Sequence, residues 1–171
     1  MPTPRATAAR QRPRPVPLDV WNTPDAWGWL AGPWSLKGES LGRTVSVPGG
    51  VRFSVGPDGV SDVPVDGPRV GVAGPIGFVS FGRDGVPTLT LSSPGAPAAL
   101  LPAVSATKTS VTFEADVDPT GQGATPLLLR ATLRRSGPSA FSLDADARLG
   151  HVPMHVLRYI ARKSDAQAPG Y

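Results

Sequence analysis

Hydrophobic and polar residues alternate most regularly in the second half of the chain. Three segments, 109–117, 127–134 and 140–147, place an apolar side chain at every second position and a polar one between. A period of two is typical of a half-buried strand, with one face toward the core and one toward water. The segments therefore predict three neighbouring antiparallel strands. Their apolar positions are Val111, Phe113, Ala115, Val117, Leu127, Leu129, Ala131, Leu133, Phe141, Leu143, Ala145 and Ala147.

The polar faces of these three segments carry charges that alternate in sign from one segment to the next. The charges are Glu114 and Asp116, then Arg130 and Arg134, then Asp144 and Asp146. If the strands pair in sequence order, unlike charges lie opposite each other and contribute about 0.2–1 kcal/mol each. We interpret them as a solvent-facing surface and not as a catalytic pair of carboxylates.

Shorter apolar segments separated by turn residues fill the first half of the chain. The Asp-Gly pairs at 58–59 and 84–85 favour hairpins, because glycine adopts a positive φ at little cost. The segment 92–102, rich in Pro and Ala, is interpreted as a loop with room for one helical turn at 98–101. The candidate strands in this half are 44–47, 51–55, 60–65, 69–72, 76–82 and 86–91.

The last patterned segment, 152–163, fits two interpretations. As a strand it places His155, Leu157, Tyr159 and Ala161 on one face. As a helix it would instead form a stripe of Met154, Leu157, Ile160 and Ala161. We favour the strand, because it continues the hairpin rhythm and supplies a partner that closes a barrel.

All four tryptophans lie between Trp21 and Trp34. Thr23 suits a helix N-cap, and Pro24 suits the first helical position. The Gly-Pro pair at 32–33 ends the helix, and a strand is expected from Trp34 onward. Because a buried tryptophan hides roughly 150–250 Å², this segment predicts a short aromatic plug at one end of a β structure.

Many short strands joined by sequential hairpins predict an all-β fold. We expect an up-and-down antiparallel β-barrel of about 8–10 strands with a short N-terminal plug helix, because closure removes exposed strand edges. The expected divisions of the chain are a disordered Pro/Arg-rich arm at 1–18, the barrel at 19–164 and a flexible C-terminus at 165–171.

The positive charge of the chain is concentrated in its first residues. Four of the 17 basic residues precede Asp19, the first acid, and the other 13 balance the 13 acidic residues. The barrel is therefore expected to be neutral, which disfavours nucleic-acid binding by its surface. The arm could dock on a protein partner or polyanion, or could be a solvated extension. Its basic residues are Arg5, Arg10, Arg12 and Arg14.

The sequence also lacks features that are typical of disulfide-bonded, membrane-spanning and secreted proteins. The chain has no cysteine, and thus no thiolate nucleophile or disulfide. No apolar run approaches the roughly 20 residues of a membrane-spanning helix, and the N-terminus lacks the apolar core of a secretory signal. We therefore expect a cytoplasmic location.

The segment from Trp29 to Trp34 resembles the Leu-x-Gly-x-Trp opening of lipocalin-like (calycin) barrels. Residues 129–132, 140–143 and 158–162 are similar to the closing strands of small bacterial lipocalin-like domains. Over about 24–163, this resemblance implies a calycin barrel that binds a small ligand.

A narrower resemblance is to nitrobindin-type haem barrels. Residues 32–38 are similar to their Gly-x-Trp-x-Gly-x-Gly opening, except that Leu36 stands where that pattern has glycine. The resemblance implies ferric haem held by His155. The alternative is an ordinary strand histidine. His151 and His155 lie four apart without a third ligand nearby, so we expect no zinc site.

The expected function follows from these observations. We expect a lipocalin-like barrel that binds a small apolar ligand, and the sequence favours a non-enzymatic protein, since it has no nucleophile motif. The alternatives are a structural component, virion-like or a complex subunit, docked through the basic arm, and a haem-binding barrel. An ordinary packed core is the favoured role of the large inward side chains, and a ligand pocket is the alternative. The candidate ligand-binding residues are Phe53, Phe78, Phe81, Phe113, Leu129, Phe141, His155 and Tyr159.

Overall fold

The structure, a computed structural model, describes residues 13–40, 43–46, 51–64, 78–93, 96–117 and 127–164. Of Phe78 and His155 only the backbone is described. The candidate strand at 69–72 lies outside the described residues.

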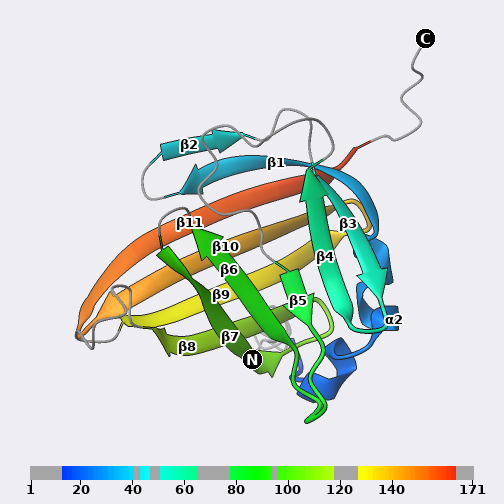
Figure 1. Cartoon of the computed structure of the whole chain (residues 1–171), viewed down its shortest axis with the longest axis horizontal. Coiled ribbons are helices and arrows are strands. Elements are labelled where there is room, and N and C mark those ends of the chain that lie inside the picture. Colours follow the sequence, from blue (N-terminus) through cyan, green and yellow to red (C-terminus); the bar gives the residue numbers. More distant parts are fainter. Residues whose placement is uncertain are drawn as a thin grey trace, which may run out of the picture.

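Antiparallel strands follow one another around a closed barrel, in sequence order from β3 to β11 (Figure 1). The first strand pairs with the last, from Trp34 opposite Lys163 to Ser40 opposite Leu157, which closes the sheet. The predicted all-β, up-and-down barrel is therefore confirmed. The strands are β1 (Gly32–Ser40), β2 (Arg43–Ser46), β3 (Val51–Gly56), β4 (Gly59–Pro64), β5 (Phe78–Ser80), β6 (Thr88–Ser93), β7 (Ala96–Ala106), β8 (Ser110–Val117), β9 (Leu127–Gly137), β10 (Ala140–Leu149) and β11 (Val152–Lys163).

Ten strands form the closed barrel, and β2 is an additional strand. The edge of β1 that faces away from β11 is shared between two partners. Its first residues, Gly32 to Trp34, pair with β3, and Lys37 to Ser40 pair with β2. The β1–β2 hairpin thus extends the wall beside β3 without taking part in closure.

The alternating segments form β8, β9 and β10 close to their predicted bounds, and the segment 152–163 forms a strand as favoured. The loop predicted at 92–102 is wrong, since this segment contains the end of β6 and the first half of β7. Apolar residues occur on both faces of β7: Leu101 is buried whereas Leu100 is 62% exposed. Without alternation, the strand had no period-two signal.

Three short helices form the tryptophan-rich plug: η1 (Leu18–Trp21), α2 (Pro24–Trp27) and η2 (Gly28–Leu30). Thr23 occupies the N-cap position of α2, but its side chain makes no capping hydrogen bond. Each indole N–H donates to a backbone carbonyl, as buried tryptophans require. The bonds run from Trp21 to Thr107 (2.7 Å), Trp27 to Trp21 (2.7 Å), Trp29 to Ala26 (2.9 Å) and Trp34 to Leu30 (2.8 Å).

Two cationic side chains, one near the end of β9 and one at the end of β11, cover the plug. The guanidinium of Arg135 lies 4.8 Å from the ring centre of Trp29, and the Lys163 ammonium lies 5.7 Å from that of Trp34. Lys163 also donates a hydrogen bond to the Trp29 carbonyl at 3.2 Å. These cation–π contacts attach the plug to β9 and β11.

The segment before the plug touches the barrel. Pro15 forms an antiparallel bridge with Thr107, and the Val16 N–H donates to the Ala106 carbonyl at 2.9 Å. Arg14 is exposed, while Arg5, Arg10 and Arg12 lie outside the described residues.

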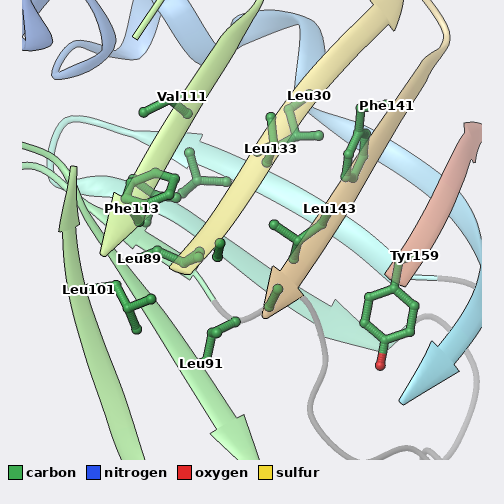
Figure 2. Packing of buried hydrophobic residues seen from close by; sticks show 14 of the residues in the cluster. Leu30, Leu89, Leu91, Leu101, Val111, Phe113, Leu133, Phe141, Leu143 and Tyr159 are labelled. Carbon is green, nitrogen blue, oxygen red and sulfur yellow. The ribbon is translucent and has the colours of Figure 1, made fainter. Parts of the chain in front are cut away.

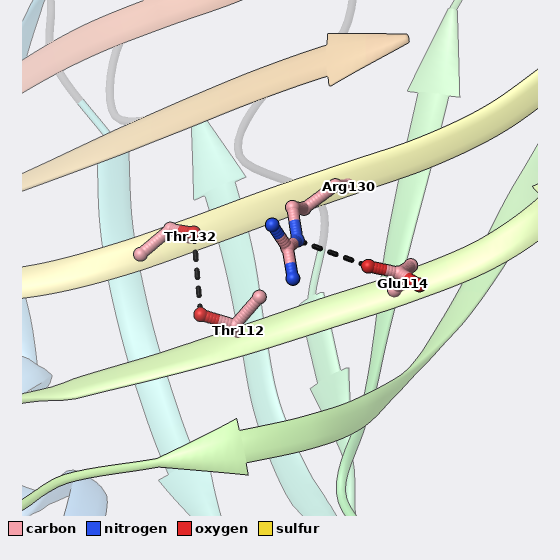
Figure 3. A network of polar contacts seen from close by, with 4 residues as sticks. All are labelled: Thr112, Glu114, Arg130 and Thr132. Atoms are coloured by element: carbon pink, nitrogen blue, oxygen red, sulfur yellow. Dashed lines mark hydrogen bonds and ion pairs between the residues drawn. The ribbon is translucent and has the colours of Figure 1, made fainter. Parts of the chain in front are cut away.

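The outer wall carries the polar faces of the strands (Figure 3). Arg130 forms the predicted ion pair with Glu114 at 2.9 Å, and the hydroxyls of Thr112 and Thr132 lie 3.3 Å apart. Asp144 pairs instead with Arg158 of β11, at 2.8 Å. This hydrogen bond raises the pKa of Arg158 above its ordinary value. The wall is a solvated, charge-paired surface, as expected.

Candidate functional site

On β8 and β10 the inward-facing side chains become smaller away from the plug, whereas on β9 and β11 Leu127, Leu129 and Leu157 lie toward the far end. On β10 the inward positions run from Phe141 and Leu143, nearer the plug, to Ala145 and Ala147 at the far end. The inward positions on β8, which β9 separates from β10, run from Phe113 to Ala115 and Val117. The lumen is therefore filled by large rings at the plug end and lined by smaller groups at the other.

On β8 and β9 solvent exposure increases in the same direction, whereas Ala145 and Ala147 on β10 are at most 2% exposed. Phe113 and Phe141 are at most 1% exposed. At the far end, Ala115, Val117 and Leu127 are half-buried, although they pack against the core. We name this end of the interior the distal lumen. Its lining residues are Ala115, Val117, Leu127, Leu129, Ala145 and Ala147.

The interior is almost free of polar side chains. Among the residues whose side chains are described, Thr90 is the one buried polar residue other than Trp and Tyr. No charged side chain is buried among them. Tyr159 is fully buried and contributes a phenol hydroxyl (Figure 2). Its register places it between Leu143 on β10 and Gly38 on β1. Among the side chains that the structure describes, such a lining can receive apolar groups but offers no counter-ion to a charged ligand.

Five of the eight predicted ligand-binding residues belong to one buried core, and Phe81 packs partly buried against it. Phe141 packs against Trp34 with ring centres 4.9 Å apart and against Phe53 at 6.2 Å. These two phenylalanines therefore form the floor of the lumen beneath the plug. The five buried residues are Phe53, Phe113, Leu129, Phe141 and Tyr159.

The side chains of Phe78 and His155 lie outside the described residues. The backbone of His155 pairs with Asp146, and a register shift separates this pair from the pair of Ala145 and Leu157. Because of this shift, alternation does not place His155 on the same face as Leu157. Haem ligation by His155 and docking through the N-terminal arginines stay predictions.

The alanines of the distal lumen were absent from the predicted site, although alternation had placed them on inward faces. The prediction selected mainly aromatic residues, and of its members Leu129 lies in the distal lumen. Small residues at the same end of two strands that flank β9, Ala115 on β8 and Ala145 and Ala147 on β10, are the signal that could have located the site.

A separate groove of about 420 Å³ lies beside the β3–β4 turn. It lies beside the short pairing between β4 and β5, which consists of two residue pairs, Gly59 with Ser80 and Val60 with Val79. Ser54 and Ser61, which lie opposite each other on β3 and β4, contribute hydroxyls to its lining. The groove is shallow and open, and it does not enter the distal lumen as defined above.

Within the described ranges, no three metal-ligating side chains cluster together. Nor does this part of the chain contain a helix with the length and apolar character needed to span a membrane.

No family model matches the chain, and no curated protein matches it. Two solved structures are similar to it. EF1p2_mFAP2b bound to DFHBI has 14% identity and a TM-score of 0.39, covering 83% of this chain and 99% of that one. A redesigned β-barrel has 15% identity and a TM-score of 0.37, covering 82% and 96%. These similarities are too low to inform function, which must be inferred from the residues of this chain.

Proposed function

We propose that this barrel binds a small, uncharged, apolar ligand in the distal lumen. The observation that carries the proposal is the contrast between the two ends of β8 and β10. Bulky aromatic side chains fill the plug end, whereas Ala145 and Ala147 and the half-buried Ala115 line the other end.

Apolar surface that stays partly solvated inside a folded protein provides a driving force for binding. Each CH₂ group that a ligand buries contributes about 0.8 kcal/mol. Covering Val117 and Leu127 would also remove their remaining apolar surface from water. Because no charged side chain is buried among those described, transfer of a charged ligand would lack compensation. These considerations favour a neutral, apolar molecule over a fatty acid carboxylate or an organic cation.

The proposal is tested by titrating the full chain with N-phenyl-1-naphthylamine, an uncharged probe that fluoresces in apolar sites. Two adjacent positions on β8 provide matched variants, since Ala115 faces inward and Asp116 is exposed. Ala115→Phe fills the distal lumen and is expected to weaken binding at least about tenfold, whereas Asp116→Phe should bind like the wild type.

Circular dichroism confirms that both variants fold. An absence of probe binding by the wild type, or equal affinities of the two folded variants, would overturn the proposal. A charged analogue of the probe that bound more tightly than the neutral one would contradict the proposed ligand class.

A further inference from the structure

The β10–β11 hairpin extends beyond the strand that closes the barrel. Pairing between β1 and β11 ends at Ser40 and Leu157, whereas β11 begins five residues earlier, at Val152. The hairpin turn therefore lies at the distal end, opposite the plug (Figure 1). Its backbone pairs continue to Leu149 and Val152 on either side of the turn.

Three large apolar side chains are exposed at the end of this hairpin. Leu149 is 44% exposed, Val152 61% and Met154 46%. Residues directly opposite in an antiparallel pair lie on the same face. Leu149 pairs with Val152, and Met154 pairs with Ala147, which is 2% exposed and lines the lumen. The three side chains, which we name the apolar tip, thus continue the face of the distal lumen.

One cationic side chain, Arg148, lies near the apolar tip, and the exposed Asp146 is two residues before it on the same face of β10. Residues 147–154 contain no acid. Arg148 is exposed and pairs with Pro153, on the hairpin face opposite the apolar tip, and the exposed His151 lies in the turn. A basic side chain beside exposed apolar groups suits the boundary between anionic headgroups and acyl chains.

The size of the apolar tip favours a lipid surface over a protein partner. A specific protein interface buries about 800 Å² per partner, from roughly 20–30 residues. Three side chains at the end of a two-stranded hairpin provide much less. Lipid requires no complementary shape, so a small apolar patch can still bind it.

We infer that the apolar tip docks the distal end of the barrel on a lipid surface, with Leu149, Val152 and Met154 inserted among the acyl chains. This interaction goes beyond the proposed ligand binding. It would bring the distal lumen to the surface in which an apolar ligand dissolves.

The inference is tested by co-sedimentation of the full chain with vesicles of phosphatidylcholine, alone and mixed with phosphatidylglycerol. The test variant carries Leu149→Ser, Val152→Ser and Met154→Ser together. The control carries Leu100→Ser, Val104→Ser and Ile160→Ser, three residues of the outer wall that are 62%, 47% and 52% exposed. The two variants thus lose similar amounts of exposed apolar surface from different faces.

The wild type and the control are expected to bind both vesicles, more strongly with phosphatidylglycerol, and the tip variant to bind at least about tenfold more weakly. Failure of the wild type to bind either vesicle would overturn the inference, as would equal losses in the two variants. Concentration-dependent self-association that the tip substitutions abolish would instead assign the tip to a second copy of the chain. Vesicle-free titration with N-phenyl-1-naphthylamine reports on the ligand site independently.

Discussion

The side-chain amide of Asn22 makes two hydrogen bonds with the backbone of Gly82, 60 residues away. The Asn22 Nδ2 donates to the Gly82 carbonyl at 2.7 Å, and the Gly82 N–H donates to the Asn22 Oδ1 at 2.9 Å. The amide thus pairs with one residue of the β5–β6 connection as a neighbouring strand would. This contact attaches the plug to the side of the barrel opposite the cations of β9 and β11.

Loss of this double contact is expected to destabilise the protein. Asn22→Ala leaves a partly buried N–H and a carbonyl of Gly82 without partners, at a cost of about 1–3 kcal/mol. Thr23→Ala is the control, because the Thr23 side chain is exposed and makes no capping bond. Urea denaturation measures both changes. A cost for Thr23→Ala as large as that for Asn22→Ala would contradict the assigned role.

The closure of the barrel depends on the absence of a side chain at Gly38. A Cβ there would lie 1.8 Å from the carbonyl oxygen of Arg158, in the strand that pairs with β1. Gly38→Ala must therefore move backbone, and we expect a loss of about 1–3 kcal/mol or more in the free energy of unfolding. At Gly28 a Cβ meets nothing within 4 Å. Gly28→Ala should leave the stability unchanged or raise it by about 0.4–1 kcal/mol.

The buried indoles of the plug contribute through both packing and hydrogen bonding. Trp27 is fully buried and donates to the Trp21 carbonyl. Trp27→Phe removes that bond and leaves a cavity, so we expect a loss of about 2–4 kcal/mol. Trp29→Phe, at a half-buried ring, should cost less. The midpoints of chemical unfolding compare the two variants, and a reversed order would show that the exposed side of the plug carries its stability.

Ion pairs of the outer wall should contribute little and should depend on salt. In the Glu114–Arg130 pair the side chains are 28% and 62% exposed. Glu114→Gln is therefore expected to cost at most about 1 kcal/mol at low ionic strength, and this difference should vanish in about 1 M salt. Unfolding free energies measured at the two salt concentrations test the expectation. A cost that persists in high salt would indicate packing of the Glu114 stem instead.

The raised pKa of Arg158 should have no effect on stability near neutral pH. A group whose pKa is higher in the folded protein stabilises it below the ordinary pKa, and that contribution is lost as pH rises through the folded-state pKa. Both values for an arginine lie in strong alkali. The stability difference between the wild type and Arg158→Gln should therefore be the same at about pH 7 and about pH 9. Thermal unfolding at the two pH values measures it.

The sequence by itself determined those elements whose signal is local. Strict alternation located β8, β9 and β10 and identified their inward faces, and sequence-order pairing placed Glu114 beside Arg130. The tryptophan cluster likewise located the plug helix, because so much apolar surface in one short segment must be buried.

Only the tertiary structure decided the features that depend on distant pairings. β7 was missed because both of its faces are apolar, and its strand conformation is stabilised by pairing with β6 and β8. Closure between Trp34 and Lys163, and the register shift beside His155, arise from matching strand lengths and twist around a complete barrel. Whether an inward alanine such as Ala115 is packed or partly solvated depends on which end of the barrel it lies in. Sequence alternation gives the face of a residue, but not its depth.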